Sequence, residues 1–351
     1  VYKTKDNSGQ TVGGPAYYIS RGLGNTTFSK FLAAFFSVAI ILALGFMGNM
    51  VQANSISDAF LNAFSLPTWV TGIGLAIIAG IIFMGGVKRI ASVTEKVVPL
   101  MALVYIVVGV IVILMNASNI PAMFAMIFKG AFNPRSVWGG ALGFGIGRAA
   151  RYGIARGLFS NEAGMGTSPI AHATANTDHP VRQGLWGVFE VTVDTLIVCT
   201  ITALCVLSTG MWKEAGINSK NIGAVPSMAF RSIFGVAGDV VVTICVFLFV
   251  LSTIIVIVFY GQRQAEFLFG EKFANIWKFV YVAAVLAGAG IFGDLSVLYS
   301  LTDFFLALVI IPNMIAVIMM APDVAAKVKE FFNTPGKYYM ADMEDKKARK
   351  I

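Results

Sequence analysis

Charged side chains are scarce in this sequence. Only 13% of its 351 residues are charged, whereas about a quarter are charged in a typical globular protein. So few charges cannot cover a water-facing surface, and 57% hydrophobic residues with a mean hydropathy of +0.78 indicate lipid as the solvent. This balance excludes a cytosolic enzyme, a nucleic-acid-binding protein and a disordered chain.

Metal-binding and catalytic side chains are also few. Three cysteines all fall in apolar runs, which favours neither a disulfide framework nor a zinc site: Cys199, Cys205 and Cys245. His172 and His179 are the two histidines, and no cysteine lies near them, so we expect no metal site at the histidines. No nucleophile, base and orienting group cluster together, so we expect no enzyme. An intramembrane enzyme is the remote alternative. It would need a second carboxylate or a His near Asp194, a carboxylate within one of the apolar runs.

Long apolar runs fill most of the chain. A helix crosses the bilayer core with about 17 to 25 residues, and we expect eight spans, at residues 31–53, 68–87, 97–115, within 122–150, 186–207, 240–260, 277–292 and 297–320. The polar segments between them are brief. The sequence therefore predicts an all-α integral membrane protein with a single membrane domain over residues 1–351, comprising a cytoplasmic amphipathic entry at 1–30, spans within 31–321 and a cytoplasmic tail at 322–351.

Basic residues are distributed unevenly between the two sides of these spans. The chain has 26 Lys and Arg residues and a net charge of +8, and all but five of the basic residues fall on the side that carries both chain ends. The exceptions are Lys129, Arg135, Lys213, Lys220 and Arg231. By the positive-inside rule both ends are cytoplasmic, in a multi-pass protein of the plasma membrane. The basic balance therefore reflects topology and not nucleic-acid binding.

Polar side chains interrupt several spans. Asn49, Gln52 and Asn54 lie near the outer end of the first span, where they either join helices by hydrogen bonds or form the polar wall of a solute pocket. Asp194, with Glu190 one turn earlier, lies in the fifth span, and Asp303 lies in the eighth. A carboxylate at such depth costs about 2.5–3.5 kcal/mol, so it serves coupling or gating or is capped by Ser and Thr hydroxyls.

Two hydroxyls stand together in the sixth span, at Ser252 and Thr253. With unwound backbone carbonyls they would supply the several oxygens that Na⁺ prefers. The alternative is that each bonds back to a carbonyl of its own helix.

The fourth span contains five glycines in nine residues: Gly139, Gly140, Gly143, Gly145 and Gly147. A spacing of four favours close helix packing, but so many glycines also make a helix easy to break, which exposes backbone groups to a ligand.

Several motifs carry a family resemblance. They are Gly157-Leu-Phe-Ser-Asn-Glu-Ala-Gly-Met-Gly-Thr-Ser-Pro-Ile-Ala-His172, His179-Pro-Val-Arg-Gln-Gly184, Val193-Asp-Thr195, Gly13-Gly-Pro-Ala-Tyr-Tyr-Ile19, Gly48-Asn-Met-Val-Gln-Ala-Asn-Ser55, Ser252-Thr253 with Tyr260-Gly261, and Ile311-Pro-Asn313. In these motifs the sequence resembles the alanine or glycine:cation symporters, the sodium:alanine symporter family, over about residues 13 to 313.

The resemblance implies a leucine-transporter-type fold, in which two inverted repeats of five spans each begin with a broken span. The eight spans would then be core helices three to ten, with the glycine-rich fourth span as the broken helix of the second repeat. The first two core helices would be absent from this sequence. Its start at Val1, without an initiator Met or a signal peptide, also suggests a piece of a longer protein.

The implied function is Na⁺-coupled symport of a small neutral amino acid, alanine or glycine, with no cofactor beyond the transported ion. We expect Na⁺ at Ser252 and Thr253, and coupling or gating at Asp194 and Asp303. The expected substrate contacts are Gln52, Asn54, Trp138, Gly139, Gly140, Phe144 and Ile257. Ile257 stands where the family usually has a Trp, and substrate preference would depend on this position if that Trp forms part of the pocket wall. An uncoupled or H⁺-coupled small-solute carrier or channel is the alternative.

Overall fold

The computed structural model describes residues 1–6, 9–132, 153–154, 157, 160–162, 164–214, 225–290 and 295–334. Over these residues the protein is mainly helical, with one antiparallel hairpin of β1 (Thr4–Lys5) and β2 (Thr11–Val12) near the N-terminus. Helices dominate because in lipid every backbone N–H and C=O group must be satisfied within the protein.

The described helices follow one another along the chain with short connections. They are α1 (Pro15–Gly22), α2 (Thr27–Ile40), the π-helix η1 (Ile41–Gly48), α3 (Asn49–Phe64), α4 (Thr68–Met84), α5 (Gly86–Met115), the 3₁₀ turn η2 (Ala117–Asn119), α6 (Ile120–Phe132), α9 (Ser168–His172), α10 (Pro180–Thr192), the π-helix η3 (Val193–Cys199), α11 (Thr200–Thr209), the 3₁₀ turn η4 (Met211–Lys213), α12 (Val225–Phe234), α13 (Val236–Phe269), α14 (Glu271–Gly290), α15 (Leu295–Met319) and α16 (Ala321–Asn333).

Six of the described segments are long and apolar enough to cross a membrane: Thr27–Leu61, Arg89–Met115, Pro180–Thr209, Val236–Phe269, Glu271–Gly290 and Val297–Met319. They overlap six of the eight expected spans. The second expected span is α4, an apolar helix of 17 residues. Of the fourth expected span, within residues 122–150, the structure describes only the start, which belongs to α6. The rest of that span lies outside the described residues. The protein is therefore a multi-pass membrane protein, and the count of eight stays a prediction.

The first span is longer than expected, because its polar C-terminal part continues the helix to Leu61. Asn49, Ser55 and Ser57 each donate to the backbone carbonyl four residues earlier, at 2.7, 2.9 and 2.8 Å. Since these side chains donate to backbone carbonyls of their own helix, they do not end it.

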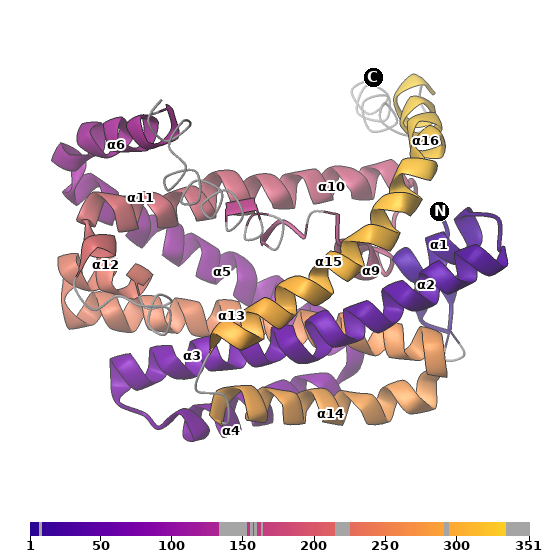
Figure 1. Ribbon diagram of the computed structural model, residues 1–351, viewed down its shortest axis with the longest axis horizontal. Helices are drawn as coiled ribbons and strands as arrows, with labels where there is room; N and C mark the ends of the chain where they lie inside the picture. Colours follow the sequence, from indigo (N-terminus) through magenta and orange to yellow (C-terminus); the bar gives the residue numbers. More distant parts are fainter. Residues whose placement is uncertain are drawn as a thin grey trace, which may run out of the picture.

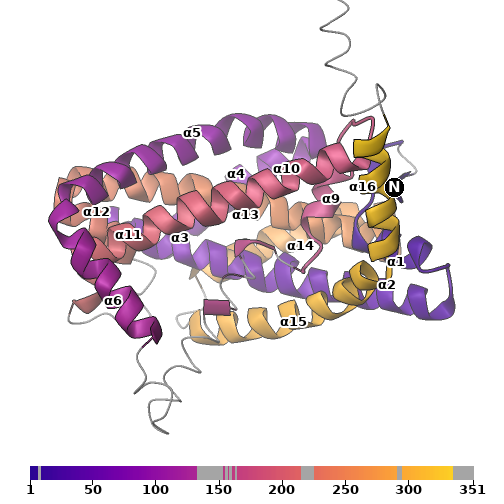
Figure 2. The same ribbon diagram turned by 90° about the horizontal axis from the view of Figure 1, so that it is seen from above.

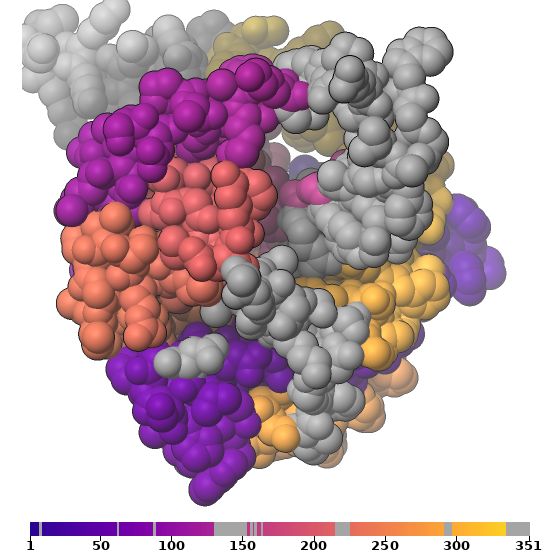
Figure 3. Space-filling model, turned by 60° about the vertical axis from the view of Figure 1, so that its left-hand side comes forward, coloured from indigo at the N-terminus to yellow at the C-terminus, as the bar shows by residue number. Residues whose placement is uncertain are grey.

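Helix α13 lies at the centre of the arrangement (Figure 1). It packs against α14, α3, η1 and α2 on one side and against α5 and α12 on the other, while α15 crosses α2 and η1. Seen from above, α5 and α15 lie on opposite sides of the molecule (Figure 2). At the end shown in Figure 3, α6, α11 and α12 lie next to one another and α15 lies across from them.

Large apolar side chains cover both the inside and the outside of this bundle. Phe36, Ile254 and Tyr281 are fully buried in its core. Trp69 and Leu103 are each 61% exposed, among many other outward aliphatic and aromatic side chains. Such a continuous apolar surface is the expected face toward lipid.

Helices pack closely around Tyr281 of α14 at the centre. A Cβ added at Gly45 of η1 would lie 3.0 Å from the Tyr281 hydroxyl, and one at Gly261 of α13 would lie 2.8 Å from it. The two glycines therefore let three helices meet around one aromatic ring.

We predict that Gly45→Ala and Gly261→Ala each lower the stability of the protein by about 1–3 kcal/mol, because the added methyl group overpacks the Tyr281 site. Unfolding in detergent micelles measures the change. Gly74→Ala is the matched control, because a Cβ at Gly74 of α4 meets no heavy atom within 4 Å. Equal unfolding midpoints for the three variants would contradict this packing.

Candidate functional site

Part of the motif from Gly157 to His172 forms a loop with an unusual backbone. We call residues 160–162 and 164–168 the signature loop. Within it Glu162, Gly164 and Gly166 have φ angles of 49°, 73° and 71°. A glutamate in this left-handed region is uncommon and costs of order 1–3 kcal/mol. The surrounding structure must therefore stabilise the loop.

Asn313 of α15 supplies part of that stabilisation. Its amide Nδ2 donates to the carbonyl oxygen of Gly164 at 2.7 Å, and its Oδ1 accepts from the hydroxyl of Tyr18 in α1. Burial raises the pKa of Tyr18, so its hydroxyl stays protonated and remains a donor. One side chain thus joins the loop, α15 and α1.

Glycines allow these segments to approach closely. A Cβ added at Gly166 would lie 2.6 Å from Asn313 Oδ1 and 2.6 Å from Pro15 Cγ, and one at Gly14 would lie 2.7 Å from Ile170 Cγ1. Three motifs that are far apart in the sequence, Gly-Gly-Pro-Ala-Tyr-Tyr, the signature loop and Ile-Pro-Asn, therefore meet at the end of the molecule that carries α1, α9 and α16 (Figure 1).

The other side of the loop is bonded to η3. Ser160 Oγ donates to Asp194 Oδ2 at 2.7 Å, and Thr195 Oγ1 donates to Asn161 Oδ1. Asp194 is thus capped by a Ser hydroxyl, which was one of the two alternatives for this carboxylate. A π-helix leaves the regular hydrogen-bond ladder and is frequent at functional sites, so the coupling or gating role of Asp194 stays a prediction.

The histidines serve structure within the described residues. His172 Nε2 lies 3.1 Å from Glu190 Oε2, and its Nδ1 lies 2.5 Å from Gln183 Nε2. His179 caps α10, because its Nδ1 accepts from the backbone N–H of Val181 at 3.3 Å. In the described part of the chain, no three His, Cys, Asp or Glu side chains gather as they would around a metal ion.

The hydroxyl pair expected to bind Na⁺ lies midway along α13. Ser252 Oγ and Thr253 Oγ1 each donate to the carbonyl oxygen of Phe249, both at 2.8 Å. This is the back-bonding alternative. Each hydroxyl oxygen keeps lone pairs that can still face a cation, so the assignment stays a prediction.

The expected substrate residues are only partly described. Asn54 Nδ2 donates to the carbonyl oxygen of Gly288 at 3.2 Å, which joins α3 to α14. Ile257 is 5% exposed and packs near Gly48, whereas Gln52 is partly buried on α3. Asp303 lies near the start of α15. Four of the expected residues lie outside the described part of the chain: Trp138, Gly139, Gly140 and Phe144. The substrate-binding role of Gln52, Asn54, Ile257 and these four residues stays a prediction. The coupling or gating role of Asp303 also stays a prediction.

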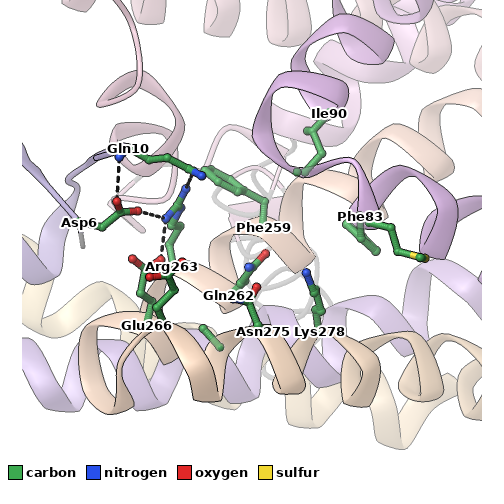
Figure 4. A pocket seen from close by; sticks show the side chains of 14 residues that line it. Asp6, Gln10, Phe83, Ile90, Phe259, Gln262, Arg263, Glu266, Asn275 and Lys278 are labelled. Carbon is green, nitrogen blue, oxygen red and sulfur yellow. Dashed lines mark hydrogen bonds and ion pairs between the residues drawn. The ribbon is translucent and has the colours of Figure 1, made fainter. Parts of the chain in front are cut away.

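A charged cluster at the end of α13 was not expected from the sequence (Figure 4). Arg263 Nη1 lies 2.6 Å from Glu266 Oε2 and 3.2 Å from Asp6 Oδ2, and its Nη2 donates to Gln10 Oε1 at 2.7 Å. The guanidinium also lies over the ring of Phe259, 5.4 Å from its centroid. The cluster fastens the β1–β2 hairpin to α13 beside a pocket of about 100 Å³.

Comparison with known proteins agrees with this arrangement of motifs. The family described as the sodium:alanine symporter family matches residues 1–345. The chain belongs to this family. Its members are transporters and not enzymes, which confirms the expectation that this protein is no enzyme.

Curated relatives cover nearly all of this family member. An uncharacterized transporter, YflA, of Bacillus subtilis is 45% identical over 351 residues, which are 100% of this chain and 72% of that relative. The sodium/alanine symporter AgcS of Methanococcus maripaludis is 35% identical over 94% of this chain and 71% of its own length. A probable sodium/glutamine symporter, GlnT, of Bacillus subtilis is 37% identical over 94% of this chain and 66% of its own length. The family resemblance is confirmed, whereas the inverted repeats stay a prediction.

We predict that Asp194→Asn lowers amino-acid uptake several-fold and leaves the protein folded. The amide keeps an oxygen that accepts from Ser160 Oγ but loses the charge that coupling or gating would use. Uptake and gel filtration of the purified variant test this.

Asp178→Asn is the matched control, because Asp178 is exposed and forms a local ion pair with Arg182, at 2.9 Å. If Asp194→Asn transports at the parent rate, the carboxylate has no role in coupling or gating.

Proposed function

We propose that this family member is a secondary active symporter that carries a small neutral amino acid, alanine or glycine, into the cell together with Na⁺. The observation that supports it most directly is the hydroxyl pair of α13. Between Thr243 and Tyr260 that helix has no other hydroxyl and no charged residue. Two neighbouring hydroxyl oxygens on an otherwise apolar stretch of helix suit a hard cation that is bound without a full counter-charge.

The substrate class follows from the same scarcity of charge. A zwitterionic amino acid needs a positive charge near its carboxylate, and a bound Na⁺ can supply it where the protein offers few basic side chains. Among the relatives, the names of AgcS and GlnT refer to alanine and glutamine. We choose a small neutral amino acid, alanine or glycine, as the substrate, with Gln52, Asn54 and Ile257 as the described contacts.

The driving force would be the Na⁺ gradient and the membrane potential, which contributes about 2.3 kcal/mol per charge per 100 mV. We place both chain ends in the cytoplasm of a plasma-membrane protein, with Asp194 and Asp303 in coupling or gating. An uncoupled or H⁺-coupled carrier would use the same helices without a Na⁺ site on α13.

We predict that Ser252→Ala and Thr253→Ala each raise the half-saturating Na⁺ concentration several-fold while stability changes little. Loss of a ligand oxygen leaves the ion under-coordinated, whereas a hydrogen bond within the membrane is worth only about 0.6 kcal/mol on average. The apparent affinity for alanine at fixed Na⁺ should fall as well, because coupled ligands affect each other reciprocally.

Thr302→Ala is the control for this pair. Its buried hydroxyl also donates to a carbonyl of its own helix, that of Leu298 four residues earlier, at 2.7 Å, but this helix is α15. Unchanged Na⁺ dependence in both α13 variants would place the cation elsewhere.

We predict that a single cysteine at Lys329 of α16 reacts only with reagents on the cytoplasmic side, and one at Ser65, between α3 and α4, only with reagents outside. Membrane-impermeant thiol labelling of intact cells and inverted vesicles measures this, in a background that lacks Cys199, Cys205 and Cys245. The reverse pattern would overturn the orientation drawn from the basic residues.

A further inference from the structure

Helix α16 carries a row of apolar side chains for which the core does not account. Val324 and Val328 are four residues apart, so they lie one above the other on the helix, and they are 56% and 39% exposed. Phe332 continues the row one turn later and is 45% exposed beside its ring contact with Phe331. Single exposed apolar residues are normal, but a row of them along a helix marks an interaction surface.

The C-terminal end of α16 docks on the protein through another residue. Phe331 is buried, and its ring centroid lies 5.1 Å from that of His179, the N-cap residue of α10. The guanidinium carbon of Arg182 lies 5.8 Å from the centroid of the same ring. Val324 and Val328 precede Phe331 by seven and three residues and are exposed, so the docking on α10 does not use them.

The rest of α16 is polar, and its charges balance. Lys329 and Asn333 are exposed and lie away from the row, because each residue turns about 100° around the helix axis. The helix has two acidic and two basic residues: Asp323, Glu330, Lys327 and Lys329. The helix is therefore amphipathic without a net charge, and its apolar row is the part that suits a lipid surface.

The position of α16 follows from its connection to the last described span. Met320 alone separates it from α15, and the N–H of Val324 donates to the Met320 carbonyl oxygen at 3.1 Å, so no loop lies between the two helices. In both views α16 runs across the direction of α13 (Figures 1 and 2). A helix that turns across the bundle directly after a span lies at the level of the membrane surface.

The row on α16 also continues the lipid-facing surface of that span. Val317, Ile318 and Met319, at the end of α15, are 44%, 66% and 59% exposed. The next large apolar side chains along the chain are Val324 and Val328, which are exposed as well. The bilayer that surrounds the end of the span is therefore the apolar phase nearest to the row.

We propose that α16 is an interfacial helix, and that Val324, Val328 and Phe332 insert into the bilayer leaflet at this end of the molecule. The occupant of the row is the membrane that the protein spans. Held between this leaflet and α10, the helix keeps Phe331 on the first turn of α10. The lipid thereby supports the end of the molecule at which the three motifs meet.

Spin labelling tests the proposal in the full-length transporter, reconstituted in lipid nanodiscs in the background that lacks the native cysteines. Nitroxides at Val324 and Val328 report on the row, and nitroxides at Ala326 and Asn333, both exposed on the other side of the helix, are the matched controls. Oxygen concentrates in the bilayer, whereas a nickel chelate stays in water. We expect the ratio of oxygen to nickel collision rates to be several-fold higher on the row than at the controls. Equal ratios on both sides overturn the proposal.

The same measurement distinguishes the other occupants. Low collision rates with both reagents on the row mean that protein covers it, which overturns the proposal. Removal of residues 335–351 and variation of the number of transporters per disc then show whether the tail or a second copy is the cover. Because the charges of α16 balance, we expect the same contrast in discs of phosphatidylcholine and of anionic phosphatidylglycerol. A contrast confined to anionic discs overturns insertion by apolar contact.

A paired substitution tests the consequence for α10. In nanodiscs, Val324→Ser combined with Val328→Ser should speed the hydrogen exchange of α16 and of the first turn of α10 several-fold, because the helix loses its contact with lipid. Ala326→Ser is the control, since it carries a comparable cost in helix propensity on the water-facing side. Equal exchange in the paired variant and the control overturns the proposal. Neither measurement requires transport, so failure here is distinguishable from failure of Na⁺ symport.

Discussion

The hydrogen bonds of Asn313 hold together the part of the protein where its most distinctive motifs meet. Its amide donates to the Gly164 carbonyl and accepts from Tyr18, so that α15, the signature loop and α1 form one unit. Because Asn313 directly follows Pro312 within α15, the helix is already perturbed where the loop docks. Without this tie, the left-handed backbone of the loop would lose its support on α15 and α1.

The lipid environment explains why several polar side chains of the spans donate hydrogen bonds to the backbone of their own helices. Asn49, Ser57, Ser252 and Thr253 all donate to carbonyls of their own helices. Such bonds make a polar residue tolerable at membrane depth without settling whether it has a second role. In the proposed transporter, the hydroxyl oxygens of α13 would turn their lone pairs to Na⁺ while keeping these bonds.

Much of the fold could be predicted because hydropathy directly reflects the need to satisfy the backbone in lipid. Apolar runs located six described spans, but the end of the first was placed too early, since back-bonded Asn and Ser residues continue the helix. Pairings between distant residues, such as Arg263 with Asp6, leave no local pattern in a single sequence. The hydrogen bonds that join Asn313 to Gly164 and Tyr18 were hidden for the same reason, because they connect residues far apart in the sequence.

Uptake of alanine by the purified full-length protein in proteoliposomes tests the account's central claim most directly, with an inward Na⁺ gradient compared against equal Na⁺ on both sides. The account predicts that alanine accumulates above its external concentration only with the gradient, and more when the interior is negative. Equal, purely equilibrating uptake under both conditions would contradict it and identify an uncoupled carrier.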